Sequence, residues 1–143
     1  MLIHLDDLAN IPLDLAPGDI VYLSGDLAAG KTTLVQTLLA RHGVDPSLIK
    51  SPTYTYYQIY TGNQGWKFAH FDLYRVPDYE TFLNIGGQEI LDNPLYTSLV
   101  EWPDILEHRY PLARRVTLQQ VDDPLRREIS WDFGPKDQIN TPR

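Results

Sequence analysis

The sequence contains Gly25-Asp26-Leu27-Ala28-Ala29-Gly30-Lys31-Thr32, a complete match to the phosphate-loop pattern G-x-x-x-x-G-K-[ST]. The apolar residues 20–23 precede it, and residues 33–39, with leucines at helical spacing, follow it. A strand, a glycine-rich loop and a helix therefore occur in the order that a phosphate-binding loop requires. An ordinary glycine turn is the alternative interpretation, and the flanking pattern favours the phosphate loop.

Each residue type in this loop has a chemical role in holding phosphate. Glycines let the backbone approach phosphate closely, and successive N–H groups at the start of the helix donate hydrogen bonds to its oxygens. Lys31 would add a positive charge at the β- and γ-phosphates, and the hydroxyl of Thr32 would then ligate Mg²⁺. The stretch thus predicts a site for a nucleoside triphosphate and Mg²⁺.

Two later strands are expected to end in a carboxylate. Residues 68–72 are apolar apart from His70 and Asp72, and a second predicted strand, residues 97–101, has Leu99 and Val100 before it ends at Glu101. Ligands of open α/β sheets lie beyond the carboxyl ends of the strands, so both acids are predicted beside the phosphates. A carboxylate there would serve as a magnesium-water ligand or would place the attacking water. A turn-forming role for Asp72 and a core position for His70 are the structural alternatives.

The segment Ser51-Pro52-Thr53 lies one helix after the loop. Nucleotide switches carry at this place the segment that responds to the γ-phosphate. The Thr53 hydroxyl is therefore predicted to reach phosphate, Mg²⁺ or the attacking water. The alternative is that Ser51 and Pro52 only shape the entry to a strand.

The pattern of elements predicts an α/β fold, with residues 1–143 forming a single P-loop NTPase-like domain. Its mixed sheet is expected to have parallel central strands flanked by helices and antiparallel hairpins. The parallel strands are predicted at 20–24, 68–72 and 97–101, and the hairpins at 54–72 and 115–133. Helices are expected over 31–42, with Gly43 as a left-handed cap, and after a cap at Asp78; the tail from 134 is expected to fray.

Composition limits the classes of function. The chain has no cysteine and a net charge of −7, and it shows neither a basic leader nor an apolar run of about 18 residues. These features predict a cytoplasmic protein with no membrane attachment, no disulfide and no cysteine-bound metal. They also argue that the chain does not grip nucleic acid alone, so any RNA involved is expected to be held by another chain.

With these motifs assembled, the chain resembles the TsaE (YjeE) family of small bacterial ATPases. That family is required for threonylcarbamoyladenosine at position 37 of tRNA. The resemblance covers roughly residues 18–133 and rests on four motifs in the family's order, namely Leu23 to Thr33, Ser51 to Thr55, His70 to Arg75 and Val100 to Pro103.

The resemblance implies a set of site residues. ATP would be held by Gly25, Asp26, Leu27, Ala28, Ala29, Gly30, Lys31, Thr32 and Thr33, with Arg127 at a family position that touches the nucleotide. Thr32 and Glu101 would lie near Mg²⁺, and the hydrolytic site would comprise Lys31, Asp72, Glu101 and Thr53. Glu101 is favoured near the metal and Asp72 near the water, but the sequence spacing does not separate the two assignments. Trp102 would pack beside the nucleotide.

The resemblance also implies partners. Family members couple ATP binding and hydrolysis to a complex with TsaB and TsaD, and TsaD transfers the threonylcarbamoyl group to tRNA. The chain would then be an ATPase that is weak alone and depends on its partners, with tRNA met only through the complex. One departure is Ala28, where the family usually has Gly, so a positive φ there would strain the loop.

Two alternatives stay open. A small P-loop kinase would need an acceptor pocket and an arginine-bearing lid, and the arginine nearest the active strands is Arg75. An ATP-operated binding module would show negligible hydrolysis by itself. A GTPase is disfavoured because the sequence lacks an N-K-x-D guanine reader.

Overall fold

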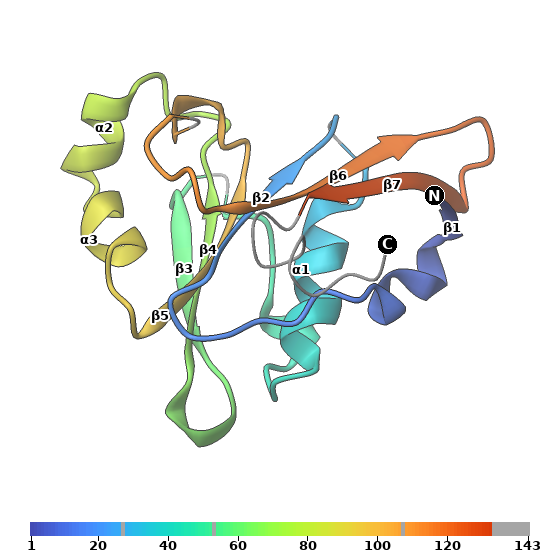
Figure 1. The fold of residues 1–143 in the computed structure, drawn as a ribbon, viewed down its shortest axis with the longest axis horizontal. Helices are drawn as coiled ribbons and strands as arrows, with labels where there is room; N and C mark the ends of the chain where they lie inside the picture. Colours follow the sequence, from blue (N-terminus) through green and yellow to red (C-terminus); the bar gives the residue numbers. More distant parts are fainter. Residues whose placement is uncertain (27, 53, 107, 133–143) are drawn as a thin grey trace.

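The computed structural model describes residues 1–26, 28–52, 54–106 and 108–132. These residues form seven strands, three α-helices and four 3₁₀ helices (Figure 1). The strands are β1 (Leu2–His4), β2 (Ile20–Ser24), β3 (Tyr57–Thr61), β4 (Lys67–Asp72), β5 (Tyr96–Glu101), β6 (Arg114–Gln120) and β7 (Arg126–Asp132). The α-helices are α1 (Lys31–Ala40), α2 (Tyr79–Asn84) and α3 (Gly87–Leu91), and the 3₁₀ helices are η1 (Leu5–Asn10), η2 (Pro46–Leu48), η3 (Asn63–Gly65) and η4 (Asp104–Leu106). The predicted frayed tail lies outside the described residues.

One seven-stranded sheet runs in the order β1-β7-β6-β2-β5-β4-β3. Strands β2, β5 and β4 are parallel, whereas β3 pairs antiparallel with β4, and β7 pairs antiparallel with both β6 and β1. The predicted mixed sheet with parallel central strands is therefore confirmed. The prediction of only three parallel strands was incomplete, because β6 also runs parallel to β2. The chain crosses the sheet between β5 and β6, and periodicity within β6 carries no information about that crossing.

Helix α1 covers one face of the sheet. It starts after Gly30, whose φ of +106° suits glycine, and it buries Leu34, Val35, Leu38 and Leu39 against alternate side chains of the central strands. It ends at Ala40, two residues earlier than predicted, and Gly43 follows in the predicted left-handed conformation.

Helices α2 and α3 cover the other face, away from α1 in Figure 1. Asp78 caps α2 by accepting a hydrogen bond of 2.8 Å from the Thr81 amide, as predicted. Phe82 of α2 is fully buried and its ring lies 5.9 Å from that of Phe71. A Cβ at Gly87 would lie 2.3 Å from the Phe82 ring, so only glycine allows this close approach.

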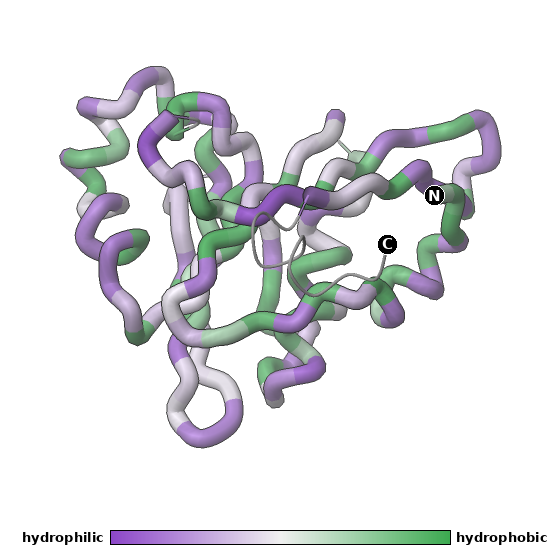
Figure 2. The backbone as a smooth tube through the Cα atoms, in the orientation of Figure 1, coloured by the Kyte–Doolittle hydropathy of each residue, from purple (hydrophilic) through white to green (hydrophobic). Residues whose placement is uncertain are grey.

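The predicted hairpin over 54–72 forms, but its first strand starts at Tyr57 and not at Tyr54. The Tyr56 amide donates to the Pro52 carbonyl at 2.8 Å, and Tyr56 has a φ of +68°, so the chain turns before it enters the sheet. Figure 2 shows hydrophilic residues at the far tip of this hairpin. None of the described helices has the length and apolar character that crossing a membrane needs.

The packing of α1 gives a stability prediction. Leu38→Ala removes a fully buried side chain and is expected to lower the free energy of unfolding by about 3 kcal/mol, because a cavity remains. Leu125→Ala is the matched control, since Leu125 is 56% exposed and its loss is expected to cost about 0.5 kcal/mol or less. Urea unfolding measures both values, and equal losses would contradict this packing.

Candidate active site

Three strands deliver the candidate site to one edge of the sheet. In the parallel register Glu101 of β5 lies opposite both Leu23 of β2 and Asp72 of β4. The loop that begins at Gly25 follows β2 directly. The two predicted acids therefore lie side by side where the phosphate loop leaves the sheet, as expected for the carboxyl ends of parallel strands.

A cavity of about 470 Å³ opens at this edge. Its walls combine residues from the loop, the start of α1, the segment before β3 and the ends of β4 and β5. They are Ala28, Gly30, Lys31, Thr32, Thr33, Ser51, Asp72, Tyr74, Arg75, Glu101 and Trp102. Tyr74 and Arg75 also line the cavity, although the sequence did not lead us to assign them to the site. The sequence feature that could have indicated them is their position directly after the strand that ends at Asp72.

The loop backbone has the conformation that its glycines permit. Gly25 has a φ of +140°, and a Cβ there would lie 2.1 Å from the Leu118 carbonyl oxygen of β6. Ala28 has a φ of +62°, so the strain expected from an alanine at this position is present in the structure. Leu27 lies outside the described residues.

Arg127 of β7 supports the loop from behind. Its guanidinium donates to the Ala29 carbonyl at 2.9 Å and to the Ala28 carbonyl at 3.4 Å, and the residue is 9% exposed. These hydrogen bonds help to hold the loop where Ala28 adopts its unfavourable conformation. A contact between Arg127 and nucleotide remains a prediction, because the side chain lies behind the loop and not among the cavity walls.

Lys31 lies folded against the loop from which it comes. Its ammonium donates to the Gly25 carbonyl at 2.5 Å and to the Asp26 carbonyl at 3.3 Å, and it sits 3.6 Å from the centroid of the Trp102 ring. Burial lowers the pKa of Lys31, and the nearby Glu101 and Asp72 oppose that shift. A phosphate group in the cavity would give this ammonium an anionic acceptor in place of neutral carbonyls.

Glu101 links the start of α1 to β4. Its Oε2 atom accepts a hydrogen bond of 3.0 Å from the Thr32 hydroxyl and lies 2.5 Å from His70 Nε2. A carboxylate only accepts hydrogen bonds, so Nε2 carries the proton. His70 is fully buried, and its Nδ1 has no hydrogen-bond partner among the described residues. His70 is therefore a core residue, as the alternative interpretation of the sequence predicted. It also contacts the carboxylate of Glu101 in the candidate site.

This arrangement fits a magnesium ion. Because the Thr32 hydroxyl donates its proton to Glu101, lone pairs of the hydroxyl oxygen stay available for a cation. Mg²⁺ prefers hard oxygen ligands and shares them with substrate phosphates. The hydroxyl of Thr32 and the carboxylate of Glu101 provide such oxygen atoms on the cavity wall beside Lys31, and these two residues would hold the ion.

Asp72 has a different environment. Its Oδ2 accepts from the Ser51 hydroxyl at 2.8 Å, and its Oδ1 accepts from the Tyr74 amide at 3.0 Å. The carboxylate is therefore held by the segment before β3 on one side and by the chain that leaves β4 on the other. Thr53, predicted to act with it, lies outside the described residues.

Aromatic side chains border the cavity. The Tyr74 and Trp102 ring centroids are 4.9 Å apart, and Trp102 has a φ of +57°. The Arg75 guanidinium lies 4.9 Å from the centroid of the Tyr54 ring. Trp102 thus lies beside the phosphate loop, and Arg75 is the arginine among the described cavity walls.

Comparison with known proteins places this site in a family. A family model described as "Threonylcarbamoyl adenosine biosynthesis protein TsaE" matches residues 4–129. The chain belongs to the TsaE family. The match runs from β1 to β7 and includes the phosphate loop, both strand-terminal acids and Arg127. The family's role lies in the biosynthesis of threonylcarbamoyladenosine in tRNA.

Individual TsaE proteins from several bacteria are also similar to this chain in sequence. The tRNA threonylcarbamoyladenosine biosynthesis protein TsaE of Rickettsia typhi is 36% identical over 111 residues, which cover 77% of this chain and 75% of that protein. The Borreliella burgdorferi protein of the same name is 39% identical over 101 residues, 71% of this chain and 72% of that protein. The match to the Rickettsia felis protein is 34% identical and spans only 63% of its length.

A solved structure also matches. The crystal structure of YdiB from Bacillus subtilis superimposes with a TM-score of 0.61 at 25% sequence identity. The superposition covers 94% of this chain and 80% of YdiB. The predicted α/β architecture is thus shared with an experimentally determined protein.

The contact between His70 and Glu101 gives a second stability prediction. His70→Leu leaves a buried carboxylate with one donor fewer and is expected to lower the free energy of unfolding by about 2 kcal/mol. His70→Gln, which keeps an N–H donor, is expected to lose less. In a Glu101→Gln background the cost of His70→Leu should shrink, and a double-mutant cycle measures this coupling. An unchanged cost would mean that His70 contributes nothing through Glu101.

Proposed function

We propose that the chain binds ATP with Mg²⁺ and hydrolyses it, as a subunit that supports threonylcarbamoyl transfer to adenosine 37 of tRNA in complex with TsaB and TsaD. The observation that carries the proposal is the meeting of Lys31, Thr32, Asp72 and Glu101 in one cavity at the phosphate loop. Membership of the TsaE family supplies the pathway. The resemblance to that family supplies the proposed partners.

The loop would hold the phosphates of ATP. Gly30, Lys31 and Thr32 line the cavity, so the positive end of α1 would meet the phosphates there. Lys31 would leave the Gly25 and Asp26 carbonyls to meet an anion. Thr32 and Glu101 would hold Mg²⁺, which when bound neutralises charge on the β- and γ-phosphates. Thr33 lies in the cavity wall one residue further along.

The two acids would divide the work. Glu101 accepts a hydrogen bond from Thr32, the other proposed magnesium ligand, and therefore would lie beside the metal ion. Asp72 is bonded to Ser51 and to the Tyr74 amide, and its remaining lone pairs would orient a water for in-line attack on the γ-phosphorus. That attack forms a bond from water oxygen to phosphorus, breaks the bond to the β-phosphate bridging oxygen and releases ADP and phosphate. Thr53 would complete the hydrolytic site.

We expect the isolated chain to be a weak ATPase because of the charges in the cavity. Two buried carboxylates face the cations Lys31 and Arg75, and the Arg75 guanidinium is engaged with the Tyr54 ring. Charge that develops on the transferred phosphoryl group is thus poorly compensated without a further cation. Partner proteins would supply that cation or release Arg75 towards the phosphates.

Lys31→Ala tests the nucleotide site. Loss of the charged donor is expected to weaken ATP binding by about 10-fold to 100-fold, and with it any association with TsaB and TsaD that requires ATP. Calorimetry with ATP and Mg²⁺, followed by pull-down with the purified pair, measures both effects. Arg126→Ala, on the exposed side of β7, is the control. Normal ATP binding by Lys31→Ala would refute the site.

Magnesium dependence tests the division between the acids. Glu101→Gln is expected to raise the Mg²⁺ concentration needed for half-maximal phosphate release, because it weakens the metal side. Asp72→Asn is expected to keep that concentration and to lower the turnover rate about 100-fold. Both are measured in the presence of TsaB and TsaD. A shift in magnesium dependence for Asp72→Asn alone would reverse the assignment.

Turnover also separates the proposal from an ATP-operated binding module. If the chain is an ATPase, we expect the rate of phosphate release to rise when TsaB and TsaD are added. A complex that forms with ATP and releases no phosphate would favour the module.

A further inference from the structure

The outer edge of β3 carries backbone groups that no other described strand pairs. The backbone amide of Asp72 donates to the Tyr56 carbonyl at 2.9 Å, and the backbone amide of Gly62 donates to the Trp66 carbonyl at 2.8 Å. In the antiparallel register of β3 with β4, the residues whose backbone groups bond to β4 are therefore every second one: 56, 58, 60 and 62. The N–H and C=O groups of Tyr57, Ile59 and Thr61 consequently point away from the sheet.

This edge lacks the features that usually prevent strands from pairing with other chains. Proteins protect exposed edges with short strands, charges, proline or bulges. The opposite edge, β1, has only three residues. Strand β3 has five, Tyr-Gln-Ile-Tyr-Thr, with no charge, proline or glycine, and Ile59 is 37% exposed. The edge is therefore built to accept an added strand.

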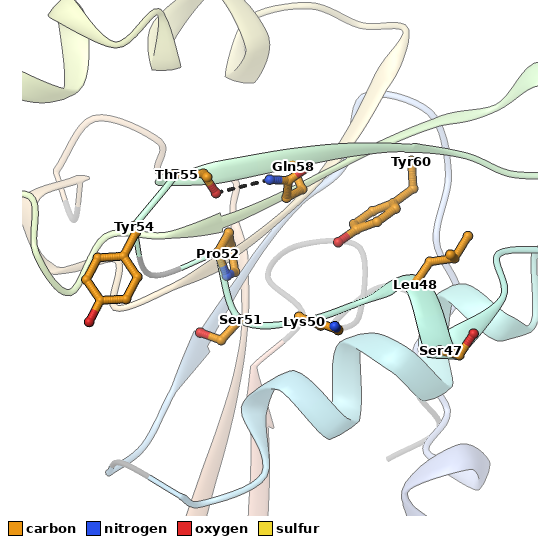
Figure 3. A pocket seen from close by; sticks show the side chains of 9 residues that line it. All are labelled: Ser47, Leu48, Lys50, Ser51, Pro52, Tyr54, Thr55, Gln58 and Tyr60. Carbon is orange, nitrogen blue, oxygen red and sulfur yellow. Dashed lines mark hydrogen bonds between the residues drawn. The ribbon is translucent and has the colours of Figure 1, made fainter.

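A hollow of about 450 Å³ lies beside the same strand (Figure 3). Gln58 and Tyr60 of β3 line it together with residues from the chain before β3, namely Ser47, Leu48, Lys50, Ser51, Pro52, Tyr54 and Thr55. Within it Leu48 is 65% exposed and Tyr54 is 80% exposed. The ammonium of Lys50 forms no ion pair with any residue that the structure describes. An occupant with apolar side chains and a carboxylate matches these walls.

We propose that an extended segment of another protein, carrying an acidic side chain, adds to the free edge of β3 as a further strand. Its backbone would pair with Tyr57, Ile59 and Thr61, and its carboxylate would meet Lys50 in the hollow. A second copy of this chain fits less well. Two β3 strands pairing edge to edge would bring no carboxylate to Lys50, and each copy carries a net charge of −7.

The position of this edge connects it to the nucleotide cavity. Ser51 belongs to the walls of both hollows, and its hydroxyl donates to Asp72. A strand docked on β3 would thus press on the segment that holds a proposed hydrolytic carboxylate. This inference rests on the proposed function, and it identifies the surface through which a protein partner would control hydrolysis.

The first test compares two lysine substitutions. Ile59→Lys puts a charge on the edge and is expected to weaken association with the purified TsaB and TsaD pair, in ATP and Mg²⁺, by about 10-fold or more. Leu125→Lys adds the same charge at an exposed leucine of the β6–β7 turn and is expected to bind as the wild type. Unfolding curves and ATP affinity of both free variants should match the wild type.

The outcomes separate the inference from the proposed function. If the wild type binds the pair and Ile59→Lys binds equally well, the edge is not the docking surface and the proposed function stands. If the wild type does not bind the pair in any nucleotide state, the proposed function fails and the inference with it. A β3-mediated dimer of the free chain in sedimentation, abolished by Ile59→Lys, would replace the partner by a second copy.

Hydrogen exchange of the complex provides a readout specific to strand addition. The amides of Gln58 and Tyr60 are expected to be protected already in the free chain, because they bond to β4. Those of Tyr57, Ile59 and Thr61 should exchange fast when free and become protected in the complex. Residue-resolved exchange of the labelled chain measures this alternation. Unchanged exchange at these three amides would overturn the proposal even if the complex forms.

Discussion

A single oxygen atom, Oε2 of Glu101, accepts hydrogen bonds from Thr32 and His70, and the architecture of the site depends on this shared acceptor. The contact joins the first turn of α1 to two neighbouring strands. Glu101 and Asp72 are 3% and 4% exposed and lie side by side. Two adjacent buried carboxylates are costly unless donors satisfy them. Thr32, His70, Ser51 and the Tyr74 amide do so, and each comes from a segment that borders the cavity.

The phosphate loop shows how a local departure is compensated from a distance. Ala28 has the positive φ that glycine adopts more easily. Arg127, about one hundred residues later in the chain, donates to the carbonyls of Ala28 and Ala29. Gly25 approaches the Leu118 carbonyl of β6 so closely that no side chain fits. The β6–β7 hairpin, placed beside β2, thus supports the loop of the candidate nucleotide site.

The sheet is asymmetric in a way that suits a subunit of a larger assembly. Its β1 edge is three residues long and is tied down by the terminal amine, whereas its β3 edge is five residues long, uncharged and open. Ser51, whose hydroxyl donates to Asp72, lines the hollow beside this open β3 edge. In the proposed function, a partner docked at the β3 edge would therefore act on the proposed hydrolytic carboxylate through Ser51.

The sequence by itself determined the loop, the elements on either side of it and the strand ends at Asp72 and Glu101. These are local features, because glycine spacing, apolar runs and capping residues act over a few neighbours. The tertiary structure alone decided that β6 runs parallel to β2, that Arg127 supports the loop backbone, and that His70 meets Glu101. It also decided that Tyr74 and Arg75 line the cavity and that β3 forms an edge. Strand order and contacts between distant side chains arise from packing of the whole chain, and no local pattern encodes which strands become neighbours.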